Sequence, residues 1–194
     1  VAEIASTLLF YVRHGADVLR MDAVTFLWKE LGTRGVHHEH THGVLRLLRA
    51  VLEAAAPWTV MLTETNVPHA ENLSYFGNGR DEAQMVYNFA LPPLLLHTLT
   101  TGDTDALRAW ATTLETPNDQ TWFLNFLASH DGIGVRSVEG ILPRARIDDL
   151  VARTRRLGGE VGMKREADGS LSPYELSINF LDALRNPDRE ETPT

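Results

Sequence analysis

The segment DVLRMDA, residues 17–23, is a short apolar run rich in strand-forming residues, and it closes on an arginine and an aspartate. Three later segments have the same character, and each is followed by polar or glycine-rich residues. They are WTVMLTE (58–64), QMVYNFAL (84–91) and TWFLNFLASHD (121–131). Four such runs, each of strand length, predict four β-strands.

Helix-like stretches separate these runs. Residues 41–57 place apolar side chains at helical spacing and end at Pro57. Residues 94–115 predict a helix that breaks near Gly102 and restarts at Asp103 or Thr104. Alternating strands and helices imply parallel strands with helices packed outside, either in a barrel or in an open sheet. Because neither a dinucleotide-binding nor a Walker glycine pattern occurs, the barrel is favoured.

The chain changes character after Gly134. Residues 136–174 are rich in Arg, Asp and Gly and predict a long excursion with a short helix from about Arg146 to Leu157. A turn is expected at residues 167–169, and residues 174–184 then return to strand-like alternation.

The composition narrows the class of function. The 194 residues are 43% hydrophobic and 23% charged, and the formal net charge is −8. This acidic balance argues against a nucleic-acid partner, because phosphate binding needs clustered Lys and Arg. The longest apolar runs are too short to span a membrane, so no membrane partner is expected. The chain has no cysteine, which excludes disulfides and thiol chemistry and favours a cytoplasmic location.

Charged residues stand where three of the predicted strands end. Arg20 and Asp22 close the first run, Glu64 closes the second, and His130 and Asp131 close the fourth. In a parallel barrel the carboxyl ends of the strands open onto one face, so these residues are expected to converge. Two carboxyl groups with different environments are what retaining glycoside chemistry requires, one ionised and one protonated.

The sequence also suggests how those environments differ. Arg20 lies two residues from Asp22, so both should face the inside of the barrel, where Arg20 would hold Asp22 ionised. Glu64 has no basic neighbour in the sequence, so like-charged neighbours could raise its pKa. A buried structural ion pair is the alternative for Arg20 and Asp22, and capping is the alternative for Glu64 and for the His130–Asp131 pair.

The segments RMDAV, LTETN and FLASHD resemble, in order and approximate spacing, three signature segments of the α-amylase superfamily, retaining α-glucoside enzymes built on a (β/α)₈ barrel. Three further stretches are similar to its sucrose-phosphorylase-like branch. They are ENLSYFGNGRDEAQMVYNFALPPLLLHTL, SHDGIGVRSVEGILP and YELSINFLDAL. The resemblance implies that Asp22 is the nucleophile, Glu64 the general acid/base and Asp131 the third carboxylate, which binds sugar hydroxyls. Arg20 and His130 match companion residues that bind substrate.

The resemblance covers only the middle of such a barrel. It implies an α/β fold with about strands 4 to 7 and their helices, plus an insertion after strand 7. Residues 1–135 would form the central part of the barrel, residues 136–184 an inserted loop subdomain, and residues 185–194 the start of the next barrel segment. We therefore expect a central piece of a longer protein that is inactive by itself. Thr25 and Phe26 replace the Lys-His pair that many amylases use for the sugar chain and calcium.

The implied reaction of the longer protein is double displacement. Asp22 would attack the anomeric carbon while Glu64 protonates the leaving oxygen, and phosphate would then release α-glucose 1-phosphate. The implied partners are a small α-glucoside, such as sucrose or glucosylglycerate, and phosphate as co-substrate, with no cofactor. The acceptor and the oligomeric state stay open. Three alternatives remain: an α-glucosidase or transglucosylase with the same triad, a catalytically silent sugar-binding protein, and a metal-dependent barrel hydrolase.

Two other groups of residues are candidate sites. Imidazoles at close spacing can bind zinc or nickel, but a solvated loop is the favoured interpretation of the histidine tract. That tract comprises His37, His38, His40 and His42. Four aromatic residues could line a sugar subsite, but a place in the core is favoured. They are Tyr75, Phe76, Tyr87 and Phe89.

Overall fold

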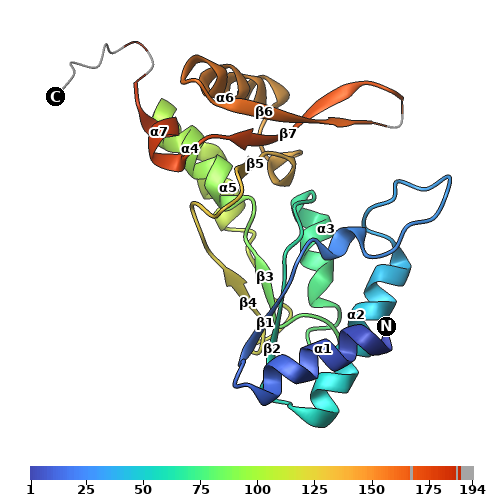
Figure 1. The fold of residues 1–194 in the computed structure, drawn as a ribbon. Helices are drawn as coiled ribbons and strands as arrows, with labels where there is room; N and C mark the ends of the chain where they lie inside the picture. The colour runs from blue at the N-terminus through green and yellow to red at the C-terminus, as the bar shows by residue number, and fades with distance from the viewer. Residues whose placement is uncertain (167, 187, 189–194) are drawn as a thin grey trace. The chain divides into compact units, whose positions relative to one another are not determined.

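The computed structural model describes residues 1–166, 168–186 and 188, and it forms two compact units (Figure 1). The first unit comprises residues 1–88 and 115–124, and the second comprises residues 89–114 and 125–194. The predicted division after residue 135 has different bounds and stays a prediction. The predicted segment 185–194 lies largely outside the described residues.

A four-stranded parallel sheet organises the first unit. Its strands are β1 (Val18–Met21), β2 (Val60–Thr63), β3 (Met85–Tyr87) and β4 (Trp122–Leu124), and they pair in chain order. The register places Arg20, Leu62, Met85 and Trp122 side by side across the sheet. Each predicted apolar run therefore contributes a strand, and the prediction of parallel pairing is confirmed.

Helices pack on one face of this sheet. They are α1 (Ala2–Arg13), α2 (Glu39–Ala55) and α3 (His69–Leu73), with the short 3₁₀ turns η1 (Val24–Phe26) and η2 (Ser74–Phe76). Leu19 and Met61, which face the helices, join a buried cluster with Leu45, Leu48 and Leu52 of α2. Burying such side chains contributes roughly 1.5–3 kcal/mol each, and this fixes the helices against the strands.

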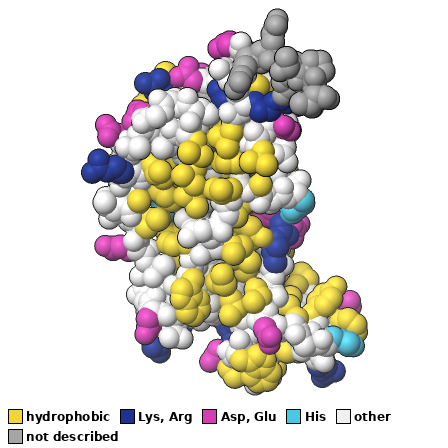
Figure 2. Space-filling view, turned by 90° about the vertical axis from the view of Figure 1, so that its left-hand side faces the viewer, with side chains coloured by type: hydrophobic (Ala, Val, Ile, Leu, Met, Phe, Trp, Pro, Cys, Tyr) yellow, Lys and Arg dark blue, Asp and Glu magenta, His cyan; other side chains and the backbone are white. Residues whose placement is uncertain are grey.

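The opposite face of the sheet is apolar and partly exposed. Val18 and Trp122 alternate away from the helix-facing residues and are 50% and 47% exposed. On the molecular face drawn in Figure 2, hydrophobic side chains gather in broad patches, whereas Lys and Arg are scattered singly among Asp and Glu.

The second unit is built around an antiparallel sheet in the order β5-β7-β6. Its strands are β5 (Ile133–Gly134), β6 (Glu160–Arg165) and β7 (Leu171–Ser177), with the 3₁₀ turn η3 (Arg136–Val138) after β5. Its helices are α4 (Leu91–Thr101), α5 (Asp105–Ala111), α6 (Arg144–Arg156) and α7 (Phe180–Leu184). A separate buried cluster, which includes Leu94, Trp110, Leu150 and Leu176, holds these elements together.

Several predicted elements are confirmed and two are wrong. The helix break occurs at Gly102, which adopts the left-handed conformation that glycine favours, and Thr104 precedes α5. The expected helix near residues 146–157 is α6. The fourth strand, however, ends at Leu124 rather than at Asp131, and residues 180–184 form α7 instead of continuing a strand. The predicted turn includes Ala167, which lies outside the described residues.

Within the described residues, no helix is both long enough and apolar enough to cross a membrane.

Candidate active site

Asp22 and Glu64 directly follow two neighbouring parallel strands. Met21 pairs with Thr63 in the register of β1 and β2, so the next residue of each strand emerges at the same edge of the sheet. The backbone N–H of Glu64 donates to the Met21 carbonyl at 3.1 Å, which extends the pairing by one residue. Parallel pairing therefore brings together two carboxylates that lie 42 positions apart in the chain.

Arg20 contacts both carboxylates with a single guanidinium. Its Nη1 lies 2.6 Å from Oδ1 of Asp22, and its Nη2 lies 2.8 Å from Oε1 of Glu64. The side chain of Asp22 is 72% exposed, whereas that of Glu64 is 13% exposed. Glu64 has no basic neighbour in the sequence, but Arg20 reaches it across the sheet.

Tyr87 supplies the third contact of Arg20. The Nε–H of Arg20 donates to the Tyr87 hydroxyl at 3.2 Å, and the guanidinium carbon lies 5.7 Å from the centre of the Tyr87 ring. Partial burial alone would lower the pKa of Arg20, but hydrogen bonds to Asp22 and Tyr87 and the charge of Glu64 outweigh it and raise that pKa. Arg20 therefore stays charged at any pH where the protein is folded.

The backbone after Asp22 also holds Glu64. Ala23 has φ 45°, a left-handed conformation that is unfavourable for a residue with a side chain. Its N–H donates to Oε2 of Glu64 at 3.0 Å. Both oxygens of Glu64 are thus engaged by the β1 strand and the residues that follow it.

His130 and Asp131 belong to the second unit. They lie in an irregular segment six and seven residues after the end of β4, with the His130 Nε2 3.3 Å from Oδ2 of Asp131. The Asp131 N–H donates to the Ser129 hydroxyl at 3.1 Å. Both side chains are exposed enough to meet a ligand, at 71% and 47%.

Gly132 fits this segment against β7. Neither Gly132 nor Gly134 has a positive φ, and Gly134 lies within β5. A Cβ atom at Gly132 would lie 2.4 Å from the Leu176 carbonyl oxygen and 2.9 Å from Cγ of Glu175. The glycine is therefore required by the close approach to β7, which holds the Asp131 segment in place.

We expect Gly132→Ala to destabilise the second unit by roughly 1–3 kcal/mol, because the added methyl group must push β7 or the Asp131 segment aside. Urea unfolding of the complete protein measures this change. Gly43→Ala is the matched control, since its site in α2 has open space and an ordinary helical backbone. Equal unfolding midpoints for Gly132→Ala and the unaltered protein would contradict the close approach.

The histidine tract is not a solvated loop throughout. His38 caps α2 by accepting from the His40 N–H at 3.1 Å, and His42 lies inside the helix, 2.7 Å from Oε2 of Glu82. His37 contacts the Tyr75 hydroxyl at 3.2 Å. Among the described residues, no group of three or more His, Cys, Asp or Glu side chains is arranged to hold a metal ion. The contacts of the tract instead tie the loop after β1 to the core.

Glu82 is the buried partner in this cluster. Its side chain is 2% exposed and accepts from His42 and, at 3.0 Å, from Nη1 of Arg46. We expect Glu82→Ala to lower the free energy of unfolding by roughly 2–3 kcal/mol, because both partners lose a charged acceptor. Chemical denaturation of the complete protein tests this against Glu115→Ala, an exposed carboxylate expected to change stability by less than about 0.5 kcal/mol. Similar losses for the two variants would show that the cluster does not stabilise the fold.

The aromatic residues divide between core and site. Tyr75 and Phe76 are buried in the core of the first unit, as predicted. Tyr87 is partly exposed and contacts Arg20, a role that its sequence position did not reveal. The available signal was its place at the end of β3, which lies beside β2, the strand that Glu64 follows.

Comparison with known proteins identifies relatives of the chain. No family model matches it. It is 51% identical over 189 residues to a glucosylglycerate phosphorylase of Allomeiothermus silvanus, covering 97% of this chain and 34% of that protein. It is 49% identical to a glucosylglycerate phosphorylase of Escherichia coli K12, covering 91% and 32%, and 31% identical to a sucrose phosphorylase of Agrobacterium vitis, covering 92% and 36%.

A solved structure shares the fold. The crystal structure of a sucrose 6F-phosphate phosphorylase from Thermoanaerobacter thermosaccharolyticum matches with a TM-score of 0.78 at 20% identity, covering 93% of this chain and 36% of that one. The parallel sheet and its helices are accordingly part of a (β/α)₈ barrel. The chain spans about a third of the length of the relatives it matches. Its sequence is similar to a segment of glucosylglycerate and sucrose phosphorylases, and its fold is similar to part of a sucrose 6F-phosphate phosphorylase.

Proposed function

We propose that the complete protein containing this chain is an α-glucoside phosphorylase that releases α-glucose 1-phosphate by retaining double displacement. The observation that carries this proposal is the bridge from Arg20 to Asp22 and Glu64 at the ends of neighbouring parallel strands. About half of the residues are identical to those of two glucosylglycerate phosphorylases, which supports a glucosylglycerate-like substrate over sucrose.

The proposed roles follow from the exposure and contacts of the two acids. Asp22 is the more exposed carboxylate and can reach an anomeric carbon, so it acts as the nucleophile and forms a glucosyl ester. Glu64 is nearly buried and held beside Asp22 through both oxygens, and the proposal assigns to it the proton transfer to the leaving oxygen. In the second half of the reaction Glu64 takes the proton from phosphate, which attacks the ester.

Arg20 has a positioning role in the proposed machinery. The Arg20 charge offsets the repulsion between the two carboxylates and holds them in one arrangement. Asp131 and His130 are proposed to bind sugar hydroxyls, with Asp131 as the third carboxylate. Inorganic phosphate is the co-substrate, and the proposal includes no cofactor. We further propose that the chain alone is inactive, since it spans about a third of its relatives. Cytoplasmic location stays a prediction.

Incubation of the complete protein with phosphate and glucosylglycerate, or with phosphate and sucrose, tests the proposal. We expect phosphate-dependent formation of glucose 1-phosphate, faster from glucosylglycerate. Free glucose as the main product would assign a hydrolase with the same triad, and a new glucoside without glucose 1-phosphate would assign a transglucosylase. Absence of product from every α-glucoside would refute the reaction class.

A further inference from the structure

A second pocket lies at the opposite end of the strands from the candidate active site. It has a volume of about 680 Å³ and is contained in the first unit. Val60 and Trp122 line it where β2 and β4 begin, and Gln84 lines it just before β3. The acids of the candidate site follow the carboxyl ends of β1 and β2, so the pocket is separate from them. Its volume lies in the range of small-molecule sites.

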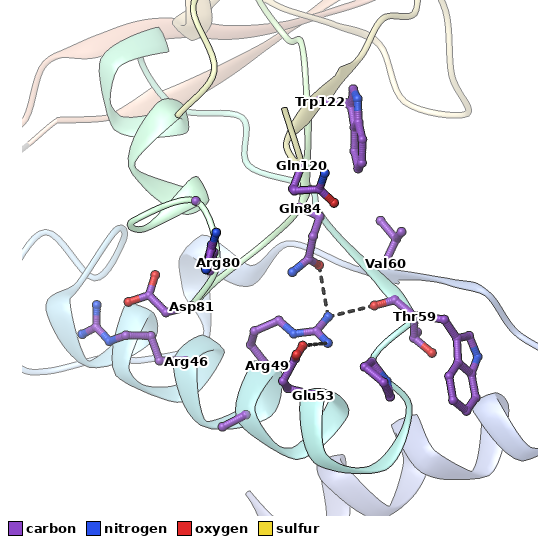
Figure 3. A pocket seen from close by; sticks show the side chains of 14 residues that line it. Arg46, Arg49, Glu53, Thr59, Val60, Arg80, Asp81, Gln84, Gln120 and Trp122 are labelled. Atoms are coloured by element: carbon purple, nitrogen blue, oxygen red, sulfur yellow. Dashed lines mark hydrogen bonds and ion pairs between the residues drawn. The ribbon is translucent and has the colours of Figure 1, made fainter. Parts of the chain in front are cut away.

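A buried arginine builds the floor of this pocket (Figure 3). The side chain of Arg49, from α2, is 3% exposed. Its Nη1 donates to the Thr59 carbonyl at 2.8 Å and to Oε1 of Gln84 at 3.1 Å, and its Nη2 lies 3.1 Å from Glu53. Gln84 also accepts from the Met61 N–H at 3.0 Å. These contacts lock α2, β2 and β3 around the floor, so the pocket is preformed.

The walls combine aromatic and charged side chains. Figure 3 shows Val60 and Trp122 at one end of the pocket and Arg46, Arg80 and Asp81 at the other. Trp122 is 47% exposed, and Trp58, which also lines the pocket, is 64% exposed. Both indoles lie outside the buried cluster of the first unit.

The charges around the pocket are nearly balanced. Arg49 is paired with Glu53, Arg46 is paired with the buried Glu82, and Asp81 lies beside Arg80 in the lining. An anion would have to compete with these carboxylates for the arginine side chains. A purely apolar ligand would remove water from the charged side chains without replacing their hydrogen bonds, which costs free energy. A neutral ring with one apolar face and several hydroxyl groups matches both walls at once, because its C–H face can lie on an indole while its hydroxyls meet Arg, Asp, Glu and Gln side chains.

We propose that this pocket binds a neutral sugar that contacts both Trp58 and Trp122, and that it does so without catalysing a reaction. The proposal does not depend on the proposed phosphorylase activity. In this proposal one sugar molecule contacts the two exposed indoles and the charged side chains of the pocket. The sugar then binds at the amino ends of the strands.

Fluorine NMR of the complete protein labelled with 5-fluorotryptophan tests the proposal directly. The resonances of Trp58, Trp122 and Trp28 are assigned from single Trp→Phe variants in an Asp22→Asn background, which prevents turnover. Titration with glucose, and separately with sucrose, should shift the Trp58 and Trp122 resonances saturably, with a Kd on the order of 1–10 mM. Trp28 is a matched control, because its indole is 39% exposed outside the pocket. No saturable shift of either pocket resonance would overturn the proposal.

Two further measurements separate the possible outcomes. Trp58→Ala should weaken the sugar-induced shift of Trp122 at least about tenfold in Kd while leaving the kcat/KM of phosphorolysis unchanged, whereas Trp28→Ala should alter neither. A Trp122 titration that is unchanged in Trp58→Ala would overturn the shared site. A shift with inorganic phosphate but not with sugar would overturn the ligand class. Glucose 1-phosphate formation is a separate readout, so failure of the proposed reaction and failure of this site are distinguishable.

Discussion

Replacing Asp22 with asparagine in the complete protein is expected to lower the rate of phosphorolysis by about 10⁴-fold or more, with the fold unchanged. Asparagine keeps the size of the side chain but cannot form the glucosyl ester, so the first displacement fails. Asp22 is 72% exposed, so the change leaves no buried charge unpaired. Glucose 1-phosphate formation under saturating phosphate measures the loss.

The control for this variant lies on the same strand segment. Asp17→Asn removes an exposed carboxylate one residue before β1 begins, at the opposite end of the strand from Asp22. It should retain full activity. In Asp22→Gly, added azide should restore turnover and give a glucosyl azide of inverted configuration, because the small anion can take the place of the missing nucleophile. Activity of Asp22→Asn within tenfold of the unaltered protein would remove Asp22 from the mechanism.

Replacing Arg20 with lysine is expected to lower kcat by about 10²- to 10³-fold. The guanidinium contacts Asp22, Glu64 and Tyr87 through three different nitrogens, whereas one ammonium group cannot span all three. The two carboxylates would then repel each other without a fixed bridge. Their positions relative to the substrate would vary more, so fewer complexes would have the geometry that the reaction needs. Steady-state kinetics over pH measure the effect, because loosening of the bridge should also move the pH profile of kcat/KM.

Two comparisons keep the Arg20 prediction specific. Tyr87→Phe removes the acceptor of the Nε–H but leaves both contacts of Arg20 with the carboxylates, so its loss in kcat should be about tenfold or less. Arg13→Lys, an exposed arginine at the end of α1, should leave both kcat and the pH profile unaltered. If Arg20→Lys retains the normal kcat and pH profile, then the bridge has no part in holding the acids for catalysis.

The sequence by itself determined the strands and the residues that end two of them. Strand-length apolar runs predicted β1 to β4, because backbone pairing and burial select such residues locally. The spacing of two between Arg20 and Asp22 predicted their contact, which the structure shows at 2.6 Å. The helix break at Gly102 was also predictable, because a left-handed helix end favours glycine whatever surrounds it.

Only the tertiary structure decided which distant residues complete the site. The register of β1 and β2 brings Glu64 to Arg20, and the position of β3 brings Tyr87 to the same guanidinium, 67 residues from Arg20 in the chain. Position 132 requires glycine because the Leu176 carbonyl of β7, 44 residues later, leaves no room for a Cβ atom. Glu82 is paired with His42 and Arg46 of α2. Sequence patterns report local periodicity and conformational preference, whereas these contacts depend on how strands align and how closely backbones approach after folding.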